Sequence, residues 1–227
     1  MTTLNRRFRD LRYRVFYKLM TQPRGPLIEL GNRQTYCHWV LMPDGLNARS
    51  IVYSGGVGRD LSFDRALVER FGCAVVLFDG TPTGQETMAL PENQIPQFKY
   101  NPVALAGQCG KLTLTPPESN VEGSWSLRAK SAATVEVPCV DLATLMERNG
   151  HDHIDLLKID IEGAEYGVID DFLKRRLPIR QVLVEFHHGF FPESIRPSQT
   201  IRAIVKMKLG GYRLIHVDVS NHTFLRD

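Results

Sequence analysis

Three carboxylates follow a short, mostly apolar run near the middle of the chain. The run covers residues 155–159, and Asp160, Glu162 and Glu165 come after it, around Gly163. Asp160 and Glu162 are two residues apart, so their side chains point the same way if the strand continues that far. Open α/β sheets bind ligands at the carboxyl ends of their strands, which makes this an expected acidic site. For Glu165 the favoured interpretation is simpler, because a helix N-terminus attracts acidic residues through its dipole.

A glycine turn follows an earlier apolar strand. Gly56 and Gly58 precede a helical pattern, and Asp79 ends the next strand about twenty positions on. Glycine permits close approach of the backbone to a ligand, and a carboxylate at this place accepts hydrogen bonds from ribose hydroxyls. The pattern therefore predicts a ligand that contains a nucleoside. A dinucleotide fingerprint has Gly or Ala where this chain has Leu61, which favours S-adenosylmethionine over a nicotinamide cofactor.

From residue 50 to about residue 190 the chain resembles the FkbM-type S-adenosylmethionine-dependent methyltransferases. Three blocks carry the resemblance, and the last is the most specific: Tyr53–Asp64, Phe78–Pro82 and Leu157–Glu165. Family members commonly have Asp-Pro-Thr-Pro where this chain has Asp-Gly-Thr-Pro from Asp79, which keeps the ribose carboxylate. The resemblance implies a Rossmann-like class I methyltransferase with a seven-stranded sheet. It also implies O-methylation, often of sugar hydroxyls.

These patterns predict a cofactor site and a catalytic site. The predicted cofactor-binding residues lie in or after the glycine turn and after the next strand: Ser54, Gly56, Gly58, Asp60, Asp79 and Thr81. Methylation of a hydroxyl needs an aligned acceptor and a base for the proton. The predicted catalytic residues are Asp160, Glu162 and His187.

His187 and His188 follow the strand expected beside the one that carries Asp160. Alternation places Glu185 and His187 on one face and His188 on the other. We predict His187 as the base, with Asp160 or Glu162 orienting it or the acceptor. The competing interpretation is that His187 is only a hydrogen-bonded polar residue at the end of a strand. Asp, Glu and His can bind a divalent cation, but no compact ligand spacing indicates one, so no metal site is predicted.

Apolar runs alternate with helical patterns from residue 50 onward. This predicts a mostly parallel sheet with helices on both faces, formed by residues 27–227 as one domain. The expected strands are residues 51–53, 74–78, 103–106, 154–159 and 181–186, and an antiparallel hairpin over 212–225 closes the sheet. The expected helices are residues 61–71, 141–149, 164–174 and 197–209. A short hairpin is expected over 27–42, and an irregular insertion with two short strands over 107–138.

Residues 1–26 form a separate basic segment. Apolar residues recur there at helical spacing among arginines: Leu4, Phe8, Leu11, Val15 and Leu19. The spacing predicts an amphipathic helix. Packing against the sheet domain or a second subunit is favoured over binding to an anionic membrane surface.

Composition limits the classes of partner. The 227 residues carry a net charge of +3, too small to indicate nucleic acid. The four cysteines form no Cys-x-x-Cys pair, which argues against zinc and indicates a reducing compartment.

No apolar segment is long enough to span a bilayer, and no secretory signal is present. We expect a cytoplasmic enzyme, peripheral to a membrane only if its first helix binds one. Its acceptor is a small molecule or glycan, and homo-oligomerisation is left open.

Two other classes of protein were weighed against a methyltransferase. A nicotinamide-dependent oxidoreductase is disfavoured by Leu61 and by the lack of a Tyr-x-x-x-Lys pair after a strand. A non-catalytic nucleoside-binding module is disfavoured because Asp160, Glu162 and the histidine pair are all present.

Overall fold

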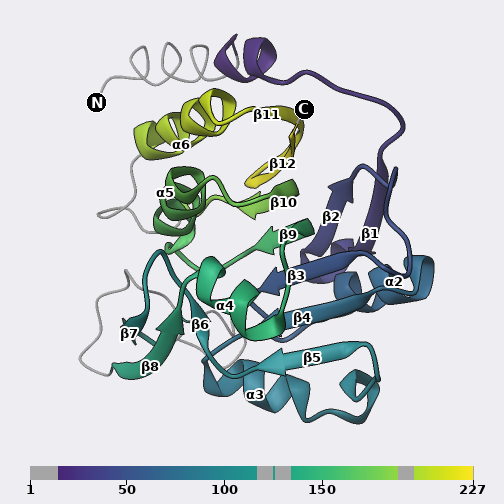
Figure 1. Cartoon of the computed structure of the whole chain (residues 1–227), viewed down its shortest axis with the longest axis vertical. Coiled ribbons are helices and arrows are strands. Elements are labelled where there is room, and N and C mark those ends of the chain that lie inside the picture. Colours follow the sequence, from purple (N-terminus) through teal and green to yellow (C-terminus); the bar gives the residue numbers. More distant parts are fainter. Residues whose placement is uncertain (1–14, 117–124, 126–133, 189–196, 227) are drawn as a thin grey trace.

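A central seven-stranded sheet organises the protein (Figure 1). The computed structural model describes residues 15–116, 125, 134–188 and 197–226. Across the sheet the strands are β11 (Tyr212–Asp218), β12 (Asn221–Arg226), β10 (Ile179–Glu185), β9 (Ile154–Ile159), β3 (Ile51–Gly55), β4 (Ala74–Phe78) and β5 (Phe98–Asn101). The five strands from β10 to β5 run parallel, and β12 is antiparallel to both of its neighbours. The predicted α/β fold class is confirmed.

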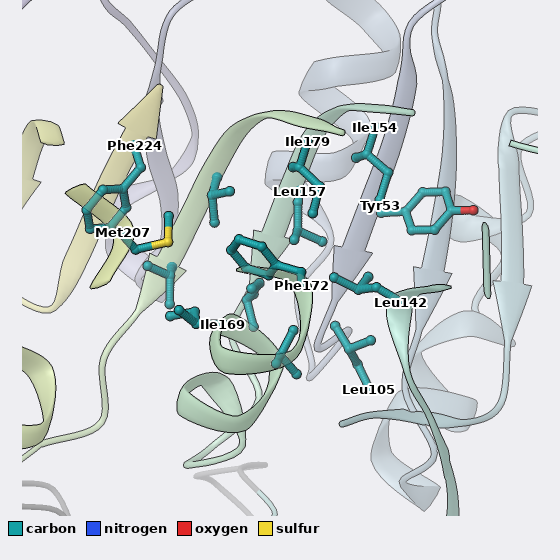
Figure 2. Packing of buried hydrophobic residues seen from close by; sticks show 14 of the residues in the cluster. Tyr53, Leu105, Leu142, Ile154, Leu157, Ile169, Phe172, Ile179, Met207 and Phe224 are labelled. Atoms are coloured by element: carbon teal, nitrogen blue, oxygen red, sulfur yellow. The ribbon is translucent and has the colours of Figure 1, made fainter. Parts of the chain in front are cut away.

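Helices cover both faces of this sheet because the parallel strands are apolar on both sides. The helices are α2 (Ser62–Phe71), α3 (Pro82–Met88), α4 (Leu142–Asn149), α5 (Glu165–Arg175) and α6 (Pro197–Leu209). One face packs against α4, α5 and α6 through the buried cluster of Figure 2, which includes Leu142, Phe172 and Met207. The other face packs against α2 and β2 through a second cluster that includes Trp39 and Phe63.

The predicted third strand is confirmed as a strand, but its place in the central sheet is wrong. Residues 103–106 do not join the central sheet, because β6 (Ala104–Leu105) belongs to a three-stranded sheet with β8 (Val135–Val140) and β7 (Gly110–Leu114). The edge of the central sheet is β5 instead. An edge strand needs no continuous apolar run, and Phe98, Lys99 and Tyr100 alternate between half-buried and exposed.

Helix α3 was missed. Thr81 caps it by accepting a hydrogen bond from the backbone N–H of Gly84, and Pro82 occupies its first turn. Both are recognised start signals for a helix. The segment lacks the aliphatic stripe that predicts the other helices, and start signals alone do not mark the length of a helix.

The two hairpins are confirmed. Strands β1 (Ile28–Asn32) and β2 (Cys37–Leu41) pair antiparallel within the predicted range, and β11 pairs antiparallel with β12. Within the C-terminal hairpin, β12 lies between β10 and β11, so β11 forms the edge of the sheet.

The N-terminal helix is confirmed over residues 15–20, but its buried face is not the predicted one. Phe16, Tyr17 and Met20 pack against the core, whereas Val15 and Leu19 are exposed. The other stripe positions, Leu4, Phe8 and Leu11, lie outside the described residues. The division of the chain at residue 26 stays a prediction, and no helix among the described residues is long and apolar enough to cross a bilayer.

Candidate active site

The glycine turn after β3 lies directly against the end of β9. Gly56 has φ +88°, and a Cβ built there would be 1.9 Å from the carbonyl oxygen of Asp160, so only glycine fits. Gly58 also has a positive φ, and a Cβ there would meet nothing within 4 Å. The turn is therefore tight against the sheet at its first glycine and open at its second, as a ligand-binding turn requires.

Asp79, which follows β4, holds this turn in place through hydrogen bonds. Its Oδ2 accepts hydrogen bonds from the backbone N–H groups of Val57 at 3.0 Å and Gly58 at 3.1 Å. Its Oδ1 accepts from the N–H and hydroxyl of Thr81 at 2.8 and 2.7 Å. Gly84 leaves room for the carboxylate, because a Cβ there would be 2.4 Å from Cγ of Asp79. Asp79 thus organises the predicted cofactor turn, and its contact with ribose stays a prediction.

Two other predicted cofactor residues lie in different surroundings. Ser54 in β3 is completely buried, so it exposes neither its side chain nor its backbone. Asp60 accepts hydrogen bonds from the backbone N–H of Ser62 at 2.6 Å and from the hydroxyl of Thr35. It therefore anchors the start of α2 to the first hairpin. The roles of both residues toward a cofactor stay predictions.

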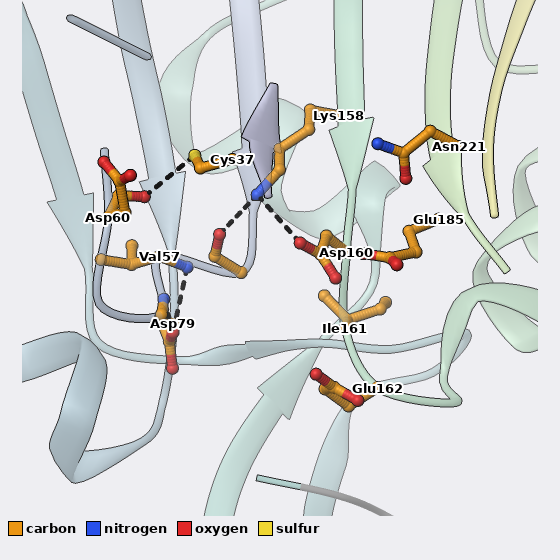
Figure 3. A network of polar contacts seen from close by, with 12 residues as sticks. Cys37, Val57, Asp60, Asp79, Lys158, Asp160, Ile161, Glu162, Glu185 and Asn221 are labelled. Carbon is orange, nitrogen blue, oxygen red and sulfur yellow. Dashed lines mark hydrogen bonds and ion pairs between the residues drawn. The ribbon is translucent and has the colours of Figure 1, made fainter. Parts of the chain in front are cut away.

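The three predicted catalytic residues come together around one imidazole. Nε2 of His187 lies 3.2 Å from Oε2 of Glu162 and 3.7 Å from Oδ1 of Asp160. Asp160 and Glu162 remain partly exposed, with side-chain exposures of 30% and 19%, while His187 is buried. His188 faces α6 instead, where its Nδ1 lies 2.9 Å from the hydroxyl of Thr200. This divergence agrees with the predicted alternation, and Figure 3 shows the carboxylates at the strand ends.

Two residues of the site were missed as functional candidates. Glu165 is completely buried, and its Oε1 lies 2.7 Å from Nδ1 of His187. A helix dipole explains an exposed acid but not a buried one, and burial could not be read from the sequence. Lys158 is also buried, and its ammonium donates to the carbonyl oxygen of Gly56 at 2.7 Å (Figure 3). The sequence does indicate a role for Lys158, because a lysine inside a buried strand is rarely without a partner.

Charges in this cluster shift two pKa values strongly. Burial opposes the charged form of His187, but the carboxylates of Glu165, Glu162 and Asp160 raise its pKa to about 10. Burial and the nearby Asp160 carboxylate raise the pKa of Glu185 to about 8. At neutral pH the ligand-free cluster therefore holds a proton on each of these two groups.

Three groups in the cluster could hold a divalent cation by distance alone. Asp160, Glu185 and His187 each offer a ligand atom, and these atoms lie within 4.8 Å of one another. The same side chains already have protein partners: Lys158 for Asp160, and Ser220 for Glu185. We assign no ion to them, and the expectation of no metal site stays a prediction.

The strand order, the glycine turn after β3 and the acidic end of β9 define a class I methyltransferase. The family model described as the Methyltransferase FkbM domain matches residues 59–214. The chain belongs to this family. It is an S-adenosylmethionine-dependent methyltransferase, which decides between the classes of protein weighed above. A comparison with curated proteins finds no match.

Two solved structures similar to this chain are fibrillarins. The fibrillarin pre-rRNA processing protein of Methanococcus jannaschii is 10% identical, with 82% of this chain and 69% of that chain covered and a TM-score of 0.47. The Aeropyrum pernix fibrillarin, solved with natively bound S-adenosyl-L-methionine, is 11% identical, with 79% and 66% covered and a TM-score of 0.41. Likeness at this level supports no argument about function.

Proposed function

We propose that this methyltransferase methylates a hydroxyl group of a sugar or glycan-like acceptor. One observation carries the proposal: the imidazole of His187 and the carboxylates of Asp160 and Glu162 gather beside the turn that contains Gly56. Methyl transfer to a hydroxyl releases a proton as the new bond forms, so the reaction needs a group to receive it. This cluster supplies such a group next to the predicted cofactor turn.

The proposed roles of the cluster residues follow from how exposed each side chain is to solvent. S-adenosylmethionine supplies an electrophilic methyl group on a sulfonium ion. Asp160 and Glu162, which are partly exposed, accept hydrogen bonds from the acceptor and hold its oxygen in line. His187 lies behind them with Nε2 toward both. The surrounding carboxylates raise its pKa to about 10, so it takes the hydroxyl proton only after it has lost its own, and turnover should rise with pH. When a bound S-adenosylmethionine supplied its methyl group to the acceptor oxygen, that oxygen would lose its proton to Nε2 of His187.

The chemistry of the cluster supports a polyhydroxyl acceptor. Carboxylates accept hydrogen bonds and repel anions, so a neutral sugar suits this site better than a phosphorylated group. By the same argument we propose no nucleic-acid partner. A cytoplasmic location is proposed from Cys37, Cys73, Cys109 and Cys139, which are all free. Homo-oligomerisation remains open.

The acceptor can be found by incubating a cell extract with methyl-labelled S-adenosylmethionine and the purified protein. We expect label in a sugar or glycan. Label only in protein or nucleic acid would contradict the acceptor class.

Variants then test the site with the acceptor so identified. Asp160→Asn and His187→Ala should lower turnover far more than cofactor affinity, because positioning and proton transfer act in the transition state. Asp152→Asn is a matched control, since its side chain is 95% exposed. Near-wild-type turnover in both site variants would place the chemistry elsewhere.

A further inference from the structure

Glu165 begins helix α5 and is completely buried. A buried carboxylate is costly unless it is paired and hydrogen-bonded, so its partners show what it is for. Two sets of partners surround it: the ring of His187, and the backbone of the turn after β9.

The first partner fixes the protonation pattern of an imidazole. Oε1 of Glu165 lies 2.7 Å from Nδ1 of His187. An ionised carboxylate only accepts hydrogen bonds, so Nδ1 must carry the hydrogen. When the ring is neutral, its lone pair is then on Nε2, which faces Glu162 and Asp160.

The second set of partners fixes the backbone on either side of Glu162. Oε1 of Glu165 accepts from the N–H of Ile161 at 3.3 Å and of Gly163 at 3.0 Å, and Oε2 lies 3.1 Å from the N–H of Gly163. Glu162 has φ +51°, a left-handed conformation that residues other than glycine seldom adopt. The bonds from Glu165 hold the turn in this conformation and so direct Glu162 toward His187.

We propose that Glu165 is the positioning residue of the site, setting the tautomer of His187 and the turn that carries Glu162. The proposal rests on the proposed function, in which Nε2 of His187 receives a proton. Because Glu165 is buried, it touches no acceptor and acts only through these two residues. One carboxylate thereby aligns a group on β10 with a group on the turn after β9.

The test reads the tautomer of His187 by long-range proton–nitrogen NMR of protein labelled with ¹⁵N-histidine. His187→Gln assigns the signal, because it removes one set of resonances. In the wild type, raising the pH until the ring is neutral should leave the hydrogen on Nδ1. A neutral ring with its hydrogen on Nε2 would overturn the proposal, and this measurement needs no variant at Glu165.

Glu165→Ala gives a sharper result. It removes the oxygen that faces Nδ1 of His187 and that also accepts from the N–H groups of Ile161 and Gly163. We expect the preference for the Nδ1 tautomer to be lost and turnover to fall on the order of 100-fold, with cofactor affinity unchanged. Glu165→Gln is the matched control, because its single amide oxygen can take the place of Oε1 and accept from the same three groups, so the hydrogen should stay on Nδ1. An unaltered tautomer in folded Glu165→Ala protein would also overturn the proposal.

The proposed function and the proposed role of Glu165 can be disproved independently of each other. The NMR measurement needs neither cofactor nor acceptor, so the absence of a hydroxyl acceptor would remove the proposed function and leave the tautomer result intact. A wrong tautomer combined with methylation of a sugar would remove only the role of Glu165.

Discussion

The ammonium group of Lys158 donates a hydrogen bond of 2.7 Å to the carbonyl oxygen of Gly56, which ties the cofactor turn to β9. The same ammonium lies 3.7 Å from Oδ2 of Asp160. Burial would lower the pKa of Lys158, but the carboxylates of Asp160 and Asp64 raise it above its usual value. Asp64, in helix α2, is itself completely buried, and Lys158 favours its ionised form against the burial that raises its pKa. One cation therefore acts on a buried acid and on an acid of the catalytic cluster.

Removing this cation should destabilise the protein and loosen the cofactor turn. Lys158→Met leaves two carboxylates without their counter-charge, and breaking a buried ion pair costs about 3–5 kcal/mol. We expect a loss of this size in urea unfolding, together with weaker binding of S-adenosylmethionine by calorimetry. Lys206→Met is the control, because its ion pair with Asp170 is 52% exposed on both sides and should contribute less than about 1 kcal/mol. Similar losses in the two variants would contradict the role of Lys158.

Asp79→Ala should weaken cofactor binding. The carboxylate holds the N–H groups of Val57 and Gly58, and it is also the predicted ribose ligand. Loss of a charge-assisted hydrogen bond costs about 1.5–3 kcal/mol of binding free energy. Calorimetry with S-adenosylmethionine measures this loss, and Asp44→Ala, at a side chain 86% exposed, is the control. Full affinity in Asp79→Ala would mean that neither the turn nor the ribose depends on this carboxylate.

Stability should fall as the pH rises from about 6.5 to 10. Below pH 6.5 the pKa of His222, which burial lowers to about 4, acts in the opposite sense to the raised pKa of Glu185. The pKa of Glu185 is raised from 4.5 to about 8, and that of His187 from 6.5 to about 10. Between pH 4.5 and about 8 Glu185 binds more protons in the folded state than in the unfolded state, and between pH 6.5 and about 10 the same holds for His187. These two groups therefore make the unfolding free energy decrease with increasing pH. The contribution of His187 is complete below its unfolded pKa and is lost as the pH passes its folded pKa.

Thermal melting across this range checks the sign. Glu185→Gln should flatten the lower part of the curve and His187→Ala the upper part, because each removes one titrating group. A melting temperature that rises over the same interval in the wild type would contradict both assignments.

The sheet could be predicted wherever a strand is buried on both faces. Strands β4 and β9 read as apolar runs because both of their sides are covered, whereas the half-exposed β5 carries no such run. The two core clusters confirm that covering layers lie on both sides.

The site could be predicted only where function leaves a local pattern. Asp160, Glu162 and His187 stand at strand ends, which the order of elements reveals. Lys158 and Glu165 matter because of what they contact after folding: Lys158 lies 102 residues from Gly56, and Glu165 lies 22 residues from His187.

Deleting residues 1–20 should lower the melting temperature. Phe16, Tyr17 and Met20 pack against the core, and the hydroxyl of Tyr17 lies 3.1 Å from Nε2 of His222 on β12. Full burial of a side chain of this size contributes about 1.5–3 kcal/mol. These three are partly buried, so each contributes less, and their combined loss should be measurable. Phe16→Ala within the full chain is a smaller version of the same test, and Leu19→Ala, at an exposed position, is its control.

Sedimentation with vesicles separates this structural role from membrane binding. The exposed Val15 and Leu19 flank Lys18 on the outer side of the helix, where an anionic surface could be met. A structural helix predicts that the full-length protein stays in solution with anionic vesicles at low salt, and that the deletion alone is unstable. Co-sedimentation of the full chain, lost on deletion with no change in melting temperature, would instead make the helix a membrane anchor. Each basic residue near such a surface contributes about 1 kcal/mol, so the binding would weaken steeply as salt is added.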